Sequence, residues 1–181
     1  MGEIKSTVEL AMERTKKFAV SEKEKEEMRQ KEAHQKAKSL FHRHRERNVS
    51  SSEILREIEK MEGNVRTAVK GFLLSQWIDA LSLDEEDERI LKGVESLRGR
   101  SIPEIKQRFH ELLSQYQIEK EKAKEKVRVQ GIEALRKEGI YGSAVVPKVE
   151  GSELWKRENE NLDRSYLLKL DEIKEQLRGY R

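Results

Sequence analysis

Residues 139–151, with the sequence GIYGSAVVPKVEG, are the one segment where a highly charged, helix-forming sequence becomes apolar and stops being helical. The chain has only two prolines, Pro103 and Pro147, and the second lies inside this segment. Residues that precede a proline avoid the helical conformation, so the backbone before Pro147 is expected to be extended. This segment, the tip, therefore predicts an extended connection between two helices.

Long helices are predicted on both sides of the tip. Residues 101–138 show apolar positions at helical spacing, dense at first and thinner in the charged second half. Gly131 lies in that second half and marks either a close approach of another segment or a weak point. Residues 152–178 carry a near-heptad apolar seam that needs a partner along its length. The seam consists of Trp155, Leu162, Tyr166, Leu170, Ile173 and Leu177. Because short connections usually join antiparallel helices, the two segments predict an antiparallel hairpin, a coiled-coil-like arm.

An elongated shape is predicted from the composition. Charged residues make up 40% of the chain and apolar residues only 35%, so one round core would be hard to fill. The 38 basic and 35 acidic residues nearly balance, whereas a disordered chain would show a large imbalance. The prediction is an all-α protein with N-terminal helices and a compact helical body in residues 1–100 and the arm in residues 101–181.

Several shorter helices are predicted before the arm. A first helix is expected over residues 3–18, and a charged helix follows from Ser21 to about Arg47, with its first half largely solvated. Three short helices around a small common core are predicted between residues 53 and 98, the last ending at Gly99. Polar residues that can cap helix N-termini are Ser21, Ser50, Asp84, Ser101 and Ser152.

The tip is the candidate binding site. Its candidate partner-binding residues are Ile140, Tyr141, Gly142, Val145, Val146 and Pro147. Exposed apolar patches mark interaction sites, and an extended apolar segment can add a strand to a partner's sheet or enter its groove. Two other interpretations stay open. The tip could fold back as a plug over its own helices, burying Tyr141 and the valines, or it could mediate self-association.

A group of basic residues near the end of the charged helix is a second candidate site. Arg43, Arg45 and Arg47 could grip phosphates. Several glutamates on the same helix would repel a nucleic acid, which is therefore the less favoured partner. His42 and His44 lie about 200° apart on a helix and cannot share a metal ion. No metal site and no cofactor is predicted.

No catalytic residue is predicted either. The sequence has no P-loop, dinucleotide-binding glycine motif, HExxH or GxSxG motif. The acidic run at 84–88 fits the first turn of a helix better than a cation site. The chain has no cysteine, its N-terminal residues lack the continuous apolar core of a secretory signal, and no stretch approaches the roughly 20 apolar residues of a membrane span. A cytoplasmic protein that is not an enzyme and does not contact membranes is the expectation.

Three segments resemble a family of small bacterial all-helical proteins whose function is uncharacterised. They are MGEIKSTVELAMERTKKF (1–18), LLSQWIDALSLD (73–84) and ALRKEGIYGSAVVPKVEGSELW (134–155). The resemblance spans most of the chain and implies a helical fold, but it transfers no catalytic or binding residue. The predicted shape is also similar, by analogy alone, to the coiled-coil arms of ribosome-associated factors and chaperones.

The function predicted from these features is a protein-interaction or scaffold module that presents an apolar tip to another protein. An RNA- or ribosome-associated factor that uses its basic helix faces is the alternative. The seam in residues 152–178 could also close a homodimer.

Overall fold

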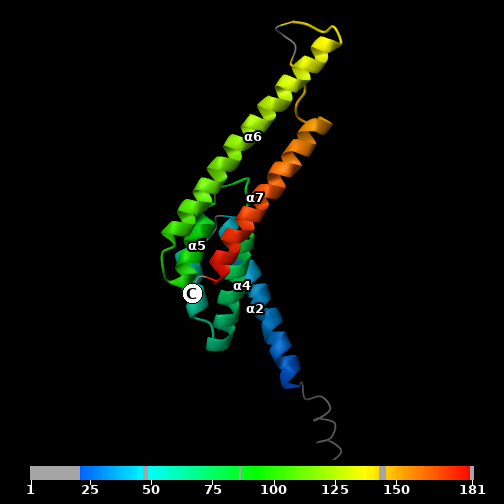
Figure 1. Ribbon diagram of the computed structural model, residues 1–181. Coiled ribbons are helices and arrows are strands. Elements are labelled where there is room, and N and C mark those ends of the chain that lie inside the picture. The colour runs from blue at the N-terminus through cyan, green and yellow to red at the C-terminus, as the bar shows by residue number, and fades with distance from the viewer. Residues whose placement is uncertain (1–20, 47–48, 86, 143–145, 180–181) are drawn as a thin grey trace, which may run out of the picture. The chain divides into compact units, whose positions relative to one another are not determined.

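The structure is a computed structural model that describes residues 21–46, 49–85, 87–142 and 146–179. This part of the chain contains helices and no strand (Figure 1). The helices are α2 (Glu22–Arg45), α3 (Ser51–Glu59), α4 (Gly63–Asp79), α5 (Glu88–Arg98), α6 (Pro103–Lys137) and α7 (Glu153–Gly179). The predicted all-α class is confirmed. The helix predicted over residues 3–18 lies outside the described residues.

The chain forms two compact units that divide within α4. The first unit is Met1–Leu73 and the second is Leu74–Arg181. The predicted division between a body in residues 1–100 and an arm in residues 101–181 falls at a different place and stays a prediction.

In the first unit, α2 is buried on one side and only in its second half. Residues 22–32 are all exposed, as predicted for the charged first half of this helix. The buried residues follow at steps of four and three: Ala33, Ala37, Leu40 and His44. Helix α3 buries Ile54 and Ile58. The predicted caps Ser21 and Ser50 both form capping boxes, with Glu24 and Glu53 respectively, which explains where α2 and α3 begin.

In the second unit, α6 and α7 pack side by side in opposite directions (Figure 1). Arg108 donates a hydrogen bond to Gln176, Tyr116 to Asp163 and Lys126 to Glu158, so early residues of α6 face late residues of α7. The buried side chains of the two helices are Ile105, Phe109, Leu112, Leu113, Tyr116 and Val127 from α6 and Tyr166, Leu170, Ile173 and Leu177 from α7. Trp155 and Leu162, the other two seam residues, are half-buried. Burial therefore decreases toward the tip.

Basic side chains of the second unit bind the carbonyl groups at two helix C-termini. Arg98 donates through Nη2 to the carbonyl oxygen atoms of Leu177 and Arg178, at the end of α7. Lys174 Nζ donates to the carbonyl oxygen of Asp79 at 3.1 Å, at the end of α4. The last carbonyl groups of a helix lack intrahelical partners and carry partial negative charge, so cations stabilise them.

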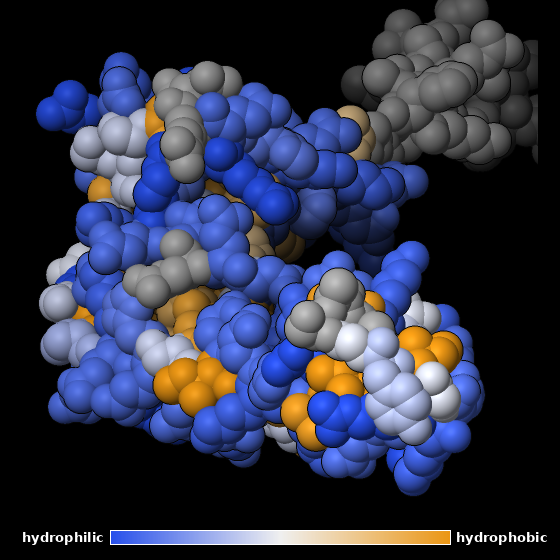
Figure 2. Space-filling model, turned by 90° about the horizontal axis from the view of Figure 1, so that it is seen from above, coloured by the Kyte–Doolittle hydropathy of each residue, from blue (hydrophilic) through white to orange (hydrophobic). Residues whose placement is uncertain are grey.

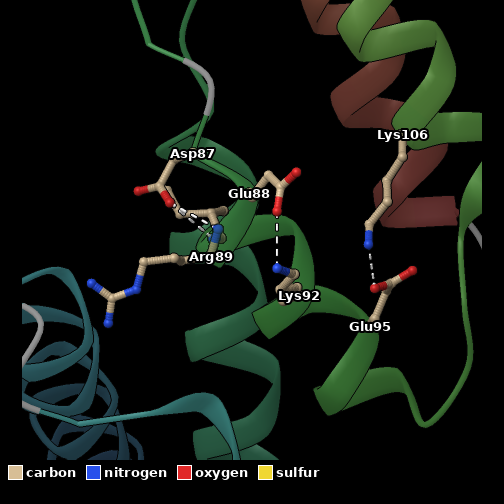
Figure 3. A network of polar contacts seen from close by, with 7 residues as sticks. Asp87, Glu88, Arg89, Lys92, Glu95 and Lys106 are labelled. Atoms are coloured by element: carbon tan, nitrogen blue, oxygen red, sulfur yellow. Dashed lines mark hydrogen bonds and ion pairs between the residues drawn. The ribbon is translucent and has the colours of Figure 1, made fainter.

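Two of the predicted caps are wrong. Asp87, and not Asp84, caps α5: its Oδ1 accepts hydrogen bonds from the backbone nitrogen atoms of Arg89 (3.0 Å) and Ile90 (3.3 Å), as Figure 3 shows for this turn. Several adjacent acidic residues suit a first turn equally well, and the spacing alone did not select among them. Ser101 does not cap α6 either, because the N-cap residue is Ile102 and Ser101 is engaged elsewhere. The proline at the start of α6 lies in the first turn, as predicted.

The Glu95 carboxylate joins α5 to the start of α6. Its Oε1 accepts hydrogen bonds from Ser101 Oγ (3.0 Å) and from the Ile102 backbone nitrogen (2.9 Å), and its Oε2 pairs with Lys106 Nζ (Figure 3). Burial alone would raise the pKa of Glu95. The hydrogen bonds from Lys106, Ile102 and Ser101 outweigh burial and hold this pKa below its ordinary value of 4.5.

Replacing Glu95 by glutamine is expected to lower the free energy of unfolding by about 1.5–3 kcal/mol at neutral pH, because a charge-assisted cluster loses its acceptor. Since the pKa is depressed in the folded state, the stabilisation is complete above pH 4.5 and is lost as the pH falls through the folded-state pKa. Urea unfolding at a series of pH values should show the difference between Glu95→Gln and the wild type shrinking below pH 4.5. The control is Glu88→Gln, which removes the exposed Glu88–Lys92 pair of Figure 3 and should change stability little. Equal effects of both substitutions would contradict the role of Glu95.

Candidate functional site

The tip begins where a glycine ends α6. Gly139 has φ +83°, its backbone nitrogen donates to the carbonyl oxygen of Arg136 (3.1 Å), and the Ile140 nitrogen donates to that of Leu135 (3.0 Å). This pair of hydrogen bonds with a left-handed residue between them is the Schellman motif, which a residue with a Cβ atom would strain. The motif fixes the direction in which the chain leaves α6 at Ile140.

The second half of the tip returns along α6 and packs against it at Gly131. A Cβ atom added at Gly131 would lie 2.8 Å from Pro147 Cβ and 3.1 Å from Pro147 Cγ. Only glycine leaves room for this contact, so of the two predicted explanations for Gly131 the close approach is the correct one. Lys124 Nζ also pairs with Glu150 Oε1 at 2.9 Å. The contact with Gly131 therefore anchors the returning segment to α6, and the exposed Lys124–Glu150 pair adds little to it.

The tip ends before Ser152, where α7 begins. The Ser152 nitrogen donates to the carbonyl oxygen of Val149 at 3.1 Å, in a turn that contains Gly151 at φ +88°. Ser152 Oγ accepts a hydrogen bond from the Trp155 nitrogen at 3.2 Å, as expected of an N-cap residue. The predicted cap at Ser152 is confirmed, and both ends of the tip are fixed by local hydrogen bonds.

Three of the candidate partner-binding side chains point into solvent. The exposed fractions are 45% for Ile140, 74% for Tyr141 and 75% for Val146. Gly142 is also exposed, with φ +146°, whereas Pro147 is half-buried by its contact with α6. Val145 lies outside the described residues. A plug would bury Tyr141 and the valines, and Tyr141 and Val146 do not meet that condition.

Basic residues surround these apolar side chains. Arg136, Lys137 and Lys148 are exposed and form no ion pair with any residue that the structure describes. Glu138 is the one acidic residue between positions 136 and 149, so this stretch carries a net charge of three minus one, or +2. Figure 2 looks down on this end of the molecule, where small hydrophobic patches lie between hydrophilic side chains. The tip is therefore an apolar surface with a basic border.

Sequence reasoning missed the contacts that hold the tip in place. Lys124 and Glu150 lie in a charged stretch where many pairings are possible, and Val149, which is half-buried, was not among the candidate residues. The one available signal was a glycine in the interior of a charged helix. It indicated a close approach without identifying Pro147 as the residue that makes it.

Replacing Gly131 by alanine tests this anchor. In an open helix the substitution would stabilise by about 1 kcal/mol, but against Pro147 we expect the free energy of unfolding to fall by about 1 kcal/mol instead. In a Pro147→Gly background the obstacle is gone, and Gly131→Ala should then stabilise. The coupling is measured by urea unfolding of the four chains of this cycle. An identical effect of Gly131→Ala in both backgrounds would show that Pro147 does not pack there.

Within the described part of the arginine group, Arg43 and Arg45 lie on different sides of α2. Arg43 Nη1 lies 3.0 Å from both Glu57 carboxylate oxygen atoms, so its charge is already compensated. Arg45 is exposed but lies two residues further along α2, about 200° around the helix. Arg47 lies outside the described residues. The binding of nucleic acid through this group stays a hypothesis that these positions do not favour.

The histidines and the hollow along α6 give no candidate metal site within the described ranges. His44 is buried, and its Nε2 lies 3.1 Å from Ser51 Oγ. Among the residues that the structure describes, no group of three or more histidine, aspartate or glutamate side chains could hold a metal ion. A hollow along α6 between Pro103 and Gln115 is lined by that helix alone and is wide open to solvent. Within the described helices, none combines the length and the apolar character that crossing a membrane requires.

Comparison of the chain with protein-family models, curated protein sequences and solved structures gives no match. The resemblance to a family of small bacterial helical proteins therefore stays a hypothesis.

Proposed function

We propose that this chain is a protein-interaction module that presents the tip, at the end of a coiled-coil-like arm formed by α6 and α7, to another protein. The observation that carries this proposal is the exposure of Tyr141 and Val146, at 74% and 75%, in a segment that is otherwise anchored. Large apolar side chains gathered at one exposed place indicate an interaction surface, whereas single exposed ones need no explanation.

The anchors favour binding because they reduce its entropic cost. A mobile loop would have to be ordered when a partner binds, and that ordering opposes association. The Schellman motif at Gly139 and the contact between Pro147 and Gly131 already restrict the described parts of the tip, residues 139–142 and 146–151. Its binding energy is therefore available for the partner.

The apolar contribution is moderate. Full burial of one large aliphatic or aromatic side chain contributes about 1.5–3 kcal/mol, so burying the remaining surface of Ile140, Tyr141 and Val146 supplies roughly 3–6 kcal/mol before association costs. That amount suits a transient contact. A tighter complex would need polar contacts in addition.

Capture of partners from native cell extract tests the proposal. The tagged wild-type chain is compared with the variant Ile140→Ser, Tyr141→Ser, Val146→Ser and with the control Leu167→Ser, Leu168→Ser. Leu167 and Leu168 are 48% and 64% exposed on α7, so the control also removes exposed apolar surface but leaves the tip intact. We expect quantitative mass spectrometry to show at least about a tenfold loss of specific partners from the tip variant alone, equivalent to 1.4 kcal/mol or more.

Circular dichroism and thermal unfolding must first show that all three chains are equally folded. If the wild type and the tip variant then retain the same proteins, the proposal is wrong. Retention that disappears after nuclease treatment, falls steeply with salt and is unchanged in the tip variant would support the RNA-binding alternative.

A further inference from the structure

The returning half of the tip has the side-chain alternation of a β-strand. Val146 and Lys148 are exposed, whereas Pro147 and Val149 are half-buried. Successive side chains of an extended chain point to opposite sides, so an extended segment lying on a surface shows this period of two. The position before Pro147 also disfavours a helical conformation at Val146. One side of residues 146–149 is therefore partly covered, with Pro147 against α6, and the other side faces solvent.

The backbone groups along one edge of this segment form no hydrogen bond with any residue that the structure describes. Within the described residues, the backbone groups of Val146 and Lys148 form no hydrogen bond, whereas the carbonyl oxygen of Val149 is used by Ser152. Alternate residues of an extended chain direct their N–H and C=O groups to the same edge. Val146 and Lys148 thus share one edge, and Pro147, which has no N–H, belongs to the opposite edge. Only the Val146/Lys148 edge can pair completely with another strand.

The charge of the tip indicates the chemistry of the partner. Arg136, Lys137 and Lys148 are exposed and without ion pairs to other described residues, and the stretch carries a net charge of +2. Complementary charge raises association rates and disfavours wrong partners. An acidic surface is the complement of this stretch.

Three other possible binding partners of the tip fit these observations less well. A lipid bilayer would cover the apolar side chains but leave the backbone groups of Val146 and Lys148 unpaired in hydrocarbon, which is costly. A protein groove lined by side chains would also leave most of these backbone groups without hydrogen-bond partners. A second copy of the chain would bring together two tips of the same charge.

We propose that residues Val146–Val149 add as a strand to an exposed, acidic β-strand edge of the partner protein. Backbone hydrogen bonds from Val146 and Lys148 supply the polar contacts that the apolar surface of the tip lacks, and Tyr141 and Val146 cover the partner's first apolar side chains. This inference rests on the proposed function, because it names the partner class of the same site.

Two substitutions of Lys148 distinguish the contribution of its backbone amide to partner binding from that of its side chain. Lys148→Pro removes the amide donor of the free edge, whereas Lys148→Ala removes only the charged side chain. Lys148 lies outside the helices, and equal thermal unfolding midpoints of the two variants and the wild type will show that the fold is kept. Using the tip-dependent partner captured from extract, we expect Lys148→Pro to weaken retention about tenfold and Lys148→Ala about twofold.

Photocrosslinking supplies a readout that does not depend on a proline variant. The full chain carrying Lys148→p-benzoylphenylalanine is irradiated in extract, and the crosslinked peptide of the partner is mapped. An adduct in an edge strand bordered by aspartate or glutamate supports the proposal. An adduct in a helix, in a groove away from any strand edge, in a lipid, in RNA or in a second copy of the chain overturns it.

The outcomes distinguish this inference from the proposed function. If the serine variant of the tip loses its partner while Lys148→Pro keeps it, the tip is a binding site but strand pairing is wrong. If the serine variant loses nothing, the proposed function is wrong and strand addition is wrong with it.

Discussion

Replacing Trp77 by alanine is expected to lower the free energy of unfolding by about 3–5 kcal/mol, the range found for large aromatic side chains removed from a core. Trp77 lies in α4 and has no exposed surface. Few other side chains in the second unit remove as much apolar surface from water, and neighbouring helices cannot fully collapse into the space it would leave. The change should be visible as a lower midpoint in urea, followed by circular dichroism.

Gly93 of α5 packs against the Trp77 ring so closely that a larger residue would not fit there. A Cβ atom at Gly93 would lie 3.0 Å from three atoms of the Trp77 ring, which is closer than ordinary contacts. Gly93→Ala is therefore expected to destabilise by about 1–3 kcal/mol, even though alanine favours a helix by about 1 kcal/mol relative to glycine. In α4, Gly71 is exposed and has nothing within 4 Å of such a Cβ atom, so Gly71→Ala should stabilise.

A double-mutant cycle shows whether the two residues act together. With Trp77 already replaced by alanine, the added methyl group at Gly93 has space, and Gly93→Ala should become neutral or stabilising. Additive effects of the two substitutions would mean that the ring and the glycine do not press on one another. In that case the glycine in α5 would have no packing explanation.

The helices could be predicted closely because their signals are local. The long helix predicted over residues 101–138 is Pro103–Lys137, and the last helix predicted over 152–178 is Glu153–Gly179. Proline in a first turn, serine at an N-cap and glycine in a left-handed C-terminal turn each act over a few residues. Asp84 shows the limit of this reasoning: in a run of acidic residues the cap is Asp87, and composition did not distinguish between the two.

The sequence could predict where the candidate site lies in the chain but could not predict whether its apolar side chains are exposed. The composition of residues 139–151 identified the tip, yet the choice between a plug and a presented surface depends on where Pro147 packs. That contact involves Gly131, in the preceding helix, and no periodicity connects the two residues. The ion pair of Arg43 could not be predicted for a similar reason. Arg43 and Glu57 pair between α2 and α3, and their pairing follows from the packing of those helices rather than from either sequence segment.

Replacing Tyr116 by phenylalanine is expected to lower the free energy of unfolding by about 1.5–3 kcal/mol, because a carboxylate between two helices loses a hydrogen-bond donor. Tyr116 of α6 is buried, and its hydroxyl donates to Asp163 Oδ1 of α7 at 2.7 Å. Asn159 donates to the other oxygen of Asp163 at 2.7 Å, and Lys120 donates to the tyrosine hydroxyl at 3.1 Å. Phenylalanine keeps the ring contact with Tyr166, so packing is preserved and the polar network alone is tested.

The same substitution should remove a part of the alkaline pH dependence. Burial, and then the hydrogen bond to Asp163, raise the pKa of Tyr116 above its ordinary value of 10.0. The hydrogen bond to Tyr116 in turn raises the pKa of Lys120. Because the folded-state pKa of Tyr116 is raised, its stabilising effect is complete below pH 10.0 and is lost as the pH rises through the folded-state value. The wild type should therefore lose stability above pH 10.0 more steeply than Tyr116→Phe.

Tyr166 provides the control, because burial raises its pKa as well and no hydrogen bond to its hydroxyl is found among the described residues. Tyr166→Phe should keep most of the stability at neutral pH, whereas Tyr116→Phe should not. If both variants match the wild type at neutral pH, the Tyr116–Asp163 hydrogen bond only replaces the hydrogen bonds that water would make. The pairing of α6 with α7, and through it the position of the tip, would then rest on the buried apolar side chains: Phe109, Leu112, Leu113, Leu170, Ile173 and Leu177.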